Sequence, residues 1–252
     1  MTSSLEHAPV VATDSPPPRK TSLWRFLWRW VLLPLILLML IFHLLVAGLL
    51  VVWQSSPVTN SMFMLAHRLN GGTVTQAWVD NHQIAKSVKQ AAIASEDANF
   101  VQHNGFDLIS IENALKTNER TGNIRAGGST ISQQLAKNLF LTAHRSYVRK
   151  AEEAVITVML EKLWDKERIL TVYLNVAEFG EGVYGIEAAS LHYFQKHAKD
   201  LTKDEAALLI SLLPRPKYYE KNLNSRRLQN KKRIILKRMP SAKLPATNDS
   251  NA

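Results

Sequence analysis

The 252-residue sequence contains no cysteine, so no disulfide can form in this chain. Its histidines are scattered without the spacing of a zinc site. Stretches that alternate apolar and polar residues, the pattern of half-buried strands, are missing as well. No G-x-x-x-x-G-K-[ST] phosphate loop occurs. Residues 180–185 match G-x-G-x-x-G, but no strand is predicted before them, so we interpret these glycines as a tight connection between helices and not as a dinucleotide site.

Acidic residues are scarcer than basic ones: 21 Asp and Glu stand against 31 Lys and Arg, a formal net charge of +10. Many of the basic residues lie in residues 221–252, which we interpret as a basic C-terminal tail. A solvated basic helix is one interpretation of this segment, and contact with anionic lipid or an anionic substrate is another. Nucleic acid is not expected as a partner, because the segment is predicted to lie outside the membrane and carries no recognisable reader motif.

Formal charge is absent from the apolar run between Trp30 and Trp53. About 20 such residues span a bilayer, so we predict a retained transmembrane anchor at residues 23–53, preceded by a disordered, proline-containing cytoplasmic tail at residues 1–22. Basic residues precede the run and none follows it until Arg68, which places the N-terminus in the cytoplasm and the rest of the chain outside. A cleaved signal peptide is the alternative, but the run lacks a good small-residue cleavage site after it.

Helical periodicity dominates the rest of the chain. The segments that show it are residues 83–97, 109–118, 130–141, 147–165, 166–176, 185–194 and 203–213. Glycine and proline residues separate them. We therefore predict one mainly α domain of short helices at residues 54–220.

Glu96 is the first candidate for chemistry. The apolar residues Ile84, Val88 and Ala92 recur every four positions, and Glu96 is the next position on the same helix face. A carboxylate on an apolar face is costly unless it is paired or protonated, and its pKa tends to rise, which suits proton transfer. A surface Glu at a helix end is the alternative that this segment leaves open.

The helix start after Gly127-Gly128 is the second candidate. The glycines allow a ligand to approach the backbone, Ser129 can cap the helix, and a helix N-terminus attracts anions. Thr130, Gln134 and Lys137 share one face, which makes that face polar and cationic. An ordinary capped helix would explain the same residues.

Glu153 is the third candidate. Its helix is apolar nearly all round from residue 154 to 160, so we predict that it is buried. Arg149 lies one turn before Glu153 and can form an ion pair with it. A purely structural pair is the alternative, and spacing alone does not decide whether Glu152 or Glu153 points inward.

Taken in order, these segments closely resemble the glycosyltransferase family 51 module, a peptidoglycan glycosyltransferase domain, over residues 78–216. The matching runs are E-D-x-x-F-x-x-H-x-G-x-D at 96–107, G-G-S-T-I-S-Q-Q-L-A-K-N at 127–138, R-K followed by E at 149–153, I-L-T-V-Y-L-N at 169–175 with Gly180, Gly185 and Ala188-Ala189, and E-A-A at 205–207. Ser132 stands where the family usually has Thr, which keeps the hydroxyl. The chain has no S-x-x-K transpeptidase motif, so it looks like the monofunctional form of the family.

The resemblance implies a lysozyme-like helical fold with a membrane-proximal lobe, and polymerisation of lipid II with release of undecaprenyl diphosphate. It implies that Glu96 is the general base that takes the proton of the acceptor 4-OH. It also implies that Glu153 is a second essential carboxylate, which positions the donor diphosphate through a cation or neighbouring basic groups. The implied substrate-binding residues are Asp97, Phe100, His103, Ser129, Thr130, Gln134, Lys137, Asn138, Arg145, Arg149 and Lys150, with Asp107 in support.

No protein metal site is predicted, and a Mg²⁺ or Mn²⁺ ion at the donor diphosphate is the cofactor that the resemblance leaves open. The expected partners are lipid II, lipid-linked glycan, membrane lipids and proteins of cell-wall synthesis or division. The expected location is the cytoplasmic (inner) membrane of a bacterium, with the catalytic domain on the periplasmic or extracellular side.

Two other function classes are weighed against polymerisation. One is a glycosidase that cuts glycan strands with a pair of carboxylates. The other is a catalytically silent membrane scaffold. The anion-binding helix start and the anchor favour polymerisation over hydrolysis, and the presence of both Glu96 and Glu153 argues against a scaffold.

Overall fold

The structure is a computed structural model that describes residues 26–121, 128–144 and 146–246. The tail predicted at residues 1–22 lies outside this part of the chain. The chain divides into two units, Met1–His43 and Leu44–Ala252. A π-helical turn, η1 (Trp28–Leu32), leads into α2 (Leu33–Val52), which crosses from the first unit into the second. Trp28–Val52 is long and apolar enough to cross a membrane, with a mean hydropathy of 3.0, as expected of a single-pass anchor.

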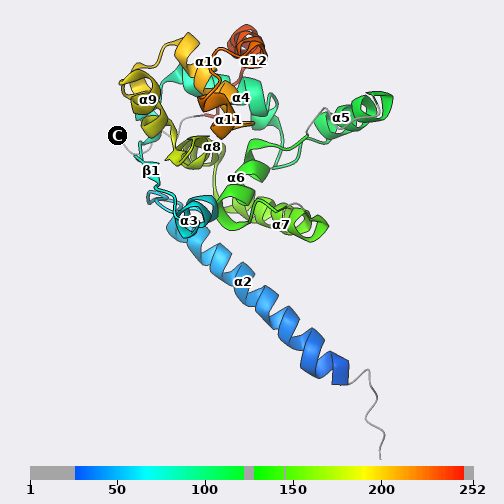
Figure 1. Cartoon of the computed structure of the whole chain (residues 1–252). Helices are drawn as coiled ribbons and strands as arrows, with labels where there is room; N and C mark the ends of the chain where they lie inside the picture. The colour runs from blue at the N-terminus through cyan, green and yellow to red at the C-terminus, as the bar shows by residue number, and fades with distance from the viewer. Residues whose placement is uncertain (1–25, 122–127, 145, 247–252) are drawn as a thin grey trace, which may run out of the picture. The chain divides into compact units, whose positions relative to one another are not determined.

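The second unit is mainly helical, as the periodicity predicts (Figure 1). Its α-helices are α3 (Met62–Leu69), α4 (Lys86–Glu96), α5 (Leu108–Thr121), α6 (Ile131–Phe140), α7 (Tyr147–Leu163), α8 (Lys166–Val176), α9 (Ile186–Phe194), α10 (Lys203–Leu212), α11 (Pro216–Glu220) and α12 (Arg226–Arg238). Short 3-10 turns are η2 (Asn81–Gln83), η3 (Phe100–Gln102), η4 (Ala198–Asp200) and η5 (Met239–Ser241). Each segment predicted to be helical contains a helix.

Side-chain caps set where several of these helices begin. The hydroxyl of Thr130 accepts the N–H of Gln133, and the Gln133 side chain accepts the N–H of Thr130. This capping box makes Thr130, not the predicted Ser129, the N-cap of α6. Ser129 lies one residue outside the helix and is therefore available for another contact.

A small sheet is present that the sequence pattern does not predict. Its strands are β1 (Thr75–Gln76), β2 (Glu178–Gly180) and β3 (Val183–Tyr184), with β3 parallel to β1 and antiparallel to β2. Strands of two or three residues are too short to show an alternating pattern. Gly182, at φ +74°, forms the turn of the β2–β3 hairpin, where a Cβ atom would lie 2.2 Å from the Thr73 carbonyl. Residues 180–185 do connect two helices, α8 and α9, as interpreted from the sequence, and the structure adds that this connection is a hairpin.

Two groups of helices position the candidate site. Helices α6, α7 and α8 pack on one another, and α4, α10 and α12 form another contacting group (Figure 1). On α4, Val88 and Ala92 are fully buried, and Ile84 just before the helix is buried too, as its face pattern predicts. The groups meet where α4 ends, because the Asp97 carboxylate accepts the N–H of Ile131 in the first turn of α6 at 3.0 Å.

The segment predicted as a basic tail contains α12, which packs against α4 and α10. Leu228 and Ile235 of α12 are buried, while most of its basic residues are exposed or half-buried. The segment is therefore helical, as one interpretation proposed, but it is packed onto the domain along one side.

The end of α2 is also packed into the second unit. Leu50 is fully buried, and its carbonyl accepts the indole N–H of Trp164 at 2.8 Å. The guanidinium of Arg168 donates to the carbonyl of Trp53 at 2.6 and 3.0 Å, and it lies 5.1 Å from the ring centre of Trp78. The predicted boundary between residues 53 and 54 therefore falls inside a packed region.

Candidate active site

Glu96 is the last residue of α4, and its side chain is 13% exposed. Its Oε1 accepts hydrogen bonds from the Ser95 hydroxyl at 2.6 Å and from the Lys231 ammonium at 3.1 Å. Its Oε2 accepts a hydrogen bond from the Gln134 amide at 3.2 Å. A helix C-terminus is the negative end of the helix dipole, so a carboxylate there needs such donors. The charge of Glu96 is thus paired, and its partner comes from α12.

The Gln134 amide is oriented by Tyr173 of α8. The Tyr173 hydroxyl donates to Gln134 Oε1 at 3.2 Å, which leaves the amide NH₂ group to face Glu96. Burial raises the pKa of Tyr173 well above its ordinary value, and the carboxylates of Glu96 and Asp97 raise it further. Tyr173 therefore stays protonated at physiological pH and remains a donor to Gln134.

Asp97 and His103 connect α4 to α6. Asp97 accepts a hydrogen bond from His103 Nε2 at 2.9 Å, besides the N–H of Ile131. His103 Nδ1 accepts the N–H of Gly105 at 3.2 Å, which places the ring proton on Nε2. The Thr130 hydroxyl donates to the Gly105 carbonyl at 2.7 Å. These residues, predicted to be near substrate, hold the loop after Glu96 against the start of α6.

Phe100 and Asp107 support the same loop. Phe100 is fully buried. Asp107 accepts hydrogen bonds from Asn99 at 2.8 Å and from the Ser110 hydroxyl at 2.6 Å. Burial by itself would raise the pKa of Asp107, but the hydrogen bonds from Ser110 and Asn99, with the nearby His103, lower it overall. Asp107 is therefore an ionised support of the loop at neutral pH.

Glu153 is the inward carboxylate of α7, with a side chain 4% exposed, whereas Glu152 is only partly buried. Arg149 Nη1 donates to Glu153 Oε2 at 2.8 Å, and the Lys150 ammonium contacts Oε1. The predicted pair of Arg149 and Glu153 is confirmed. Lys150 Nζ also lies 3.4 Å from the Ser129 hydroxyl, which connects this cluster to the start of α6.

Two cavities of about 220 Å³ each adjoin the hydrogen bond between Glu96 and Gln134. The lining of the first includes Ser95, Glu96, Asp97, Asp107, Ser129, Thr130 and Arg238. The lining of the second includes Phe63, Gln134, Lys137, Asn138, Tyr173 and Glu178. The predicted binding residues of the 127–138 run are therefore divided between two cavities, one lined by Glu96 and the other by Gln134.

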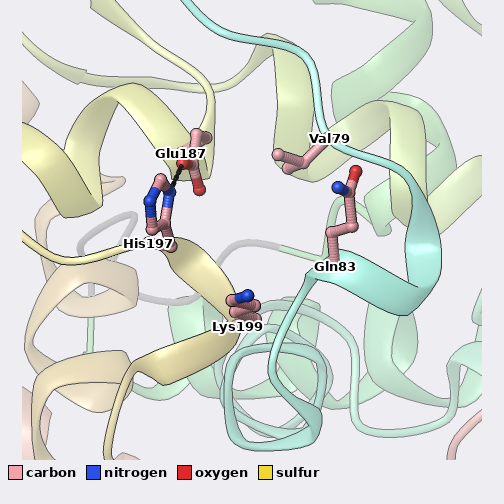
Figure 2. A pocket seen from close by; sticks show the side chains of 5 residues that line it. All are labelled: Val79, Gln83, Glu187, His197 and Lys199. Atoms are coloured by element: carbon pink, nitrogen blue, oxygen red, sulfur yellow. Dashed lines mark hydrogen bonds and ion pairs between the residues drawn. The ribbon is translucent and has the colours of Figure 1, made fainter.

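The remaining predicted site residue, Arg145, lies outside the described residues. A further cavity of about 150 Å³ is lined by Val79, Gln83, Glu187, His197 and Lys199 (Figure 2). Its Glu187 carboxylate bonds to His197 Nδ1 at 2.6 Å. None of the predicted site residues lines this cavity, so it is distinct from the Glu96 site.

The fit of a resident metal ion is poor at Glu153. Both of its carboxylate oxygens already contact a cationic side chain, so a divalent cation would have to displace Arg149 or Lys150. Within the described residues, no group of three or more His, Cys, Asp or Glu side chains is arranged to hold a metal ion. The cation predicted at the donor diphosphate stays untested, and no chemical step below depends on it.

The structure adds four residues that the sequence reasoning did not select: Ser95, Tyr173, Lys231 and Arg238. Lys231 lies three residues after Leu228 and four before Ile235, which are both buried. That spacing on an otherwise basic helix was a usable signal for an inward-facing Lys. Tyr173 lies in the matched run at 169–175, and Arg238 lies seven residues after Lys231 on the same helix face, whereas Ser95 carries no local pattern that separates it from an ordinary residue.

Similarity to known proteins accounts for the motifs of this site. A family model described as Transglycosylase matches residues 64–240. The chain belongs to the transglycosylase family. The resemblance of the ordered motifs to a peptidoglycan glycosyltransferase module is thereby confirmed. The matched range extends beyond the predicted domain end at residue 220 and includes α12, so this transglycosylase domain contains Lys231.

Relatives of this transglycosylase cover nearly all of its length. It is 46% identical to the biosynthetic peptidoglycan transglycosylase of Acinetobacter baylyi over 223 residues, which are 88% of this chain and 99% of the relative. It is 46% identical to the protein of the same name from Dechloromonas aromatica, over 88% of this chain and all of the relative. The corresponding protein of Nitrosomonas eutropha is 47% identical over 86% of this chain and 92% of the relative.

Proposed function

We propose that this transglycosylase polymerises lipid II into linear glycan strands of peptidoglycan and releases undecaprenyl diphosphate. Its family and the names of its relatives support this function. The observation that carries it is the cavity beside Glu96: the same cavity is lined by Ser129, whose hydroxyl lies 3.4 Å from Lys150. This arrangement supports the proposal, because transfer from a diphosphate donor needs a carboxylate that can act as a base and cations nearby that can bind the diphosphate.

In the proposed reaction, Glu96 accepts the proton of the acceptor sugar 4-OH while that oxygen attacks C1 of the donor sugar. The bond from C1 to the diphosphate oxygen breaks, and its electron pair leaves with undecaprenyl diphosphate. Arg149 and Lys150 stabilise the developing negative charge, and Lys137 contributes from the second cavity. Glu153 is a positioning residue in this scheme, because its carboxylate holds Arg149 and Lys150 on the same helix face.

The test is incubation of the full chain in detergent with labelled lipid II, with the products sized on a gel. Polymerisation gives lengthening glycan and released undecaprenyl diphosphate. A glycosidase would leave lipid II unpolymerised and shorten preformed glycan strands instead. That second pattern would replace the proposed function with hydrolysis.

We further propose that the chain is a single-pass protein of the bacterial cytoplasmic membrane, with its N-terminus in the cytoplasm and its catalytic domain outside. The apolar helix and the basic residues before it support this orientation. Large apolar side chains at the starts of α5 and α7 are strongly exposed: Leu108, Ile109, Tyr147 and Val148. Such exposed apolar side chains are suited to contact with lipid. Proteins of cell-wall synthesis remain predicted partners.

Two truncations test the role of the anchor. Removal of residues 1–43 should leave a folded domain that polymerises less well on membranes, because the anchor concentrates enzyme and lipid II in one plane. Removal of residues 1–53 should also lower the thermal unfolding temperature, because it deletes Leu50 and the carbonyl groups that Trp164 and Arg168 bind. Equal stability of the two truncated proteins would contradict this account of the packed helix end.

A further inference from the structure

We infer that Lys231 is a positioning residue for Glu96: together with Ser95 it holds Oε1, so that Oε2 is the oxygen that takes the acceptor's proton. This inference rests on the proposed function. The contacts that carry it are the 3.1 Å ion pair from Lys231 and the 2.6 Å hydrogen bond from Ser95, both to Oε1.

The lone pairs of the carboxylate distinguish its two oxygens. Each carboxylate oxygen has two acceptor positions. Both positions on Oε1 are used, one of them by a cation, and an oxygen engaged by an ammonium group is a weaker proton acceptor. Among the described residues, Oε2 accepts one hydrogen bond, from the neutral amide of Gln134 at 3.2 Å. The acceptor position that remains for the proton of the acceptor hydroxyl is therefore on Oε2.

The charge of Lys231 also suits a Glu96 side chain that acts as a base. Glu96 is 13% exposed at the negative end of α4, where burial and the helix dipole both disfavour a carboxylate. The Lys231 ammonium group lies at hydrogen-bond distance and pairs the charge of this carboxylate. When Glu96 becomes protonated, Lys231 remains as a cation beside the cavity, and the diphosphate carries away the electron pair of the broken bond.

The fold holds Lys231 in this place. Leu228 and Ile235, one turn before and one turn after it on α12, are buried at 0% and 1% exposure. Helix α12 packs against both α4 and α10, so the Lys231 backbone has little freedom relative to Glu96. Arg238 lies seven residues after Lys231, on the same face of α12, and lines the Glu96 cavity. One face of this basic helix is therefore a wall of the active site.

The experiment compares Lys231→Met, Lys231→Arg and Ser95→Ala with Lys232→Met in the full chain, with initial rates measured over a range of lipid II concentrations. Lys232 is the matched control, because it is the adjacent lysine on α12 and pairs with Asp204 instead of Glu96. Met keeps the apolar stem of Lys, and Ser95→Ala tests the hold on Oε1 without touching α12. Thermal unfolding is recorded for every variant.

We expect Lys231→Met to lower kcat by about 10- to 100-fold with little change in KM, since a slightly misplaced catalytic group costs up to about 100-fold. Lys231→Arg should recover most of this loss, Ser95→Ala should lower kcat by about 2- to 10-fold, and Lys232→Met should behave as the wild type. A merely structural role for Lys231 would instead lower the unfolding temperature and leave kcat per folded molecule unchanged.

Three results would overturn the inference. They are unchanged kcat in both Lys231→Met and Ser95→Ala, an equal loss in Lys232→Met, and a rise in KM at constant kcat, which would make Lys231 a substrate-binding group. If Lys231→Met does not fold, Lys231→Arg and Ser95→Ala decide by the same criteria. Failure of the wild type to polymerise lipid II would contradict the proposed function itself, so the two failures are distinguishable.

Discussion

The region around Glu153 and the region around Glu96 each hold a nearly buried carboxylate, but their partners come from very different distances along the chain. Glu153 contacts Lys150 and Arg149, three and four residues earlier on the same helix. Glu96 contacts Gln134, 38 residues away, and Lys231, 135 residues away. The cluster at Glu153 forms whenever α7 forms, whereas the environment of Glu96 requires α4, α6 and α12 to be packed together. The proposed role of Glu96 as base therefore depends on the packing of several helices, whereas the proposed phosphate-binding cations Arg149 and Lys150 depend on one helix.

The sharpest test of this comparison is Glu96→Gln, for which we expect polymerisation to be abolished. Gln is isosteric but cannot accept the proton, and a general base contributes about 100- to 10,000-fold. The fold and lipid II binding should be nearly intact, as checked by thermal unfolding and by binding to detergent-solubilised lipid II. Turnover near the wild-type rate would remove Glu96 from the role of base.

The next largest effect is expected for Glu153→Gln, with a loss of about 100-fold in kcat/KM for lipid II. The neutral amide no longer holds Arg149 and Lys150 in place, although both cations remain. Glu152→Gln is the matched control, because Glu152 is the adjacent and less buried residue. A similar loss in both variants would mean that removal of any carboxylate from this part of α7 lowers activity, and that the contacts of Glu153 with Arg149 and Lys150 do not explain the effect.

Loss of single cations should have smaller effects that depend on position. We expect Lys137→Ala and Arg149→Ala to weaken donor use by about 10- to 150-fold, because a charge-assisted contact contributes about 1.5–3 kcal/mol. Lys232→Ala should have no such effect, because Lys232 pairs with Asp204 and not with Glu96. The affinity of each variant for free diphosphate, measured by its competition with lipid II for binding, tests the same contacts without the transfer reaction. Equal losses at all three positions would show that overall basicity matters and that no defined site exists.

The smallest effect is expected for Tyr173→Phe, about 2- to 10-fold in kcat. The change removes the donor that orients the Gln134 amide and leaves the buried ring in place. Because the raised pKa keeps Tyr173 protonated, the loss should be the same at neutral and mildly alkaline pH. A loss that appears only at alkaline pH would mean that Tyr173 ionises and acts in another way.

Local features of this protein could be predicted from its sequence because they depend on residues within a few turns of each other. The apolar run of the anchor, the helical periodicity and the i,i+4 pair of Arg149 and Glu153 are of this kind. The buried face of α4 is another, and its four-residue step correctly predicts a Glu96 side chain that is largely removed from solvent. The motifs at 96–107 and 127–138 are continuous, so they also led to the family.

Other features were decided only by the tertiary structure. The charge partner of Glu96 is Lys231, whose helix follows the motifs and looks like a solvated tail when it is considered alone. The two-residue strand β1 exists because β3 pairs with it. Periodicity indicates which face of a helix is buried, but it does not indicate which residues that face contacts. Packing brings distant segments together, and here it supplied Gln134 and Lys231 as partners of Glu96.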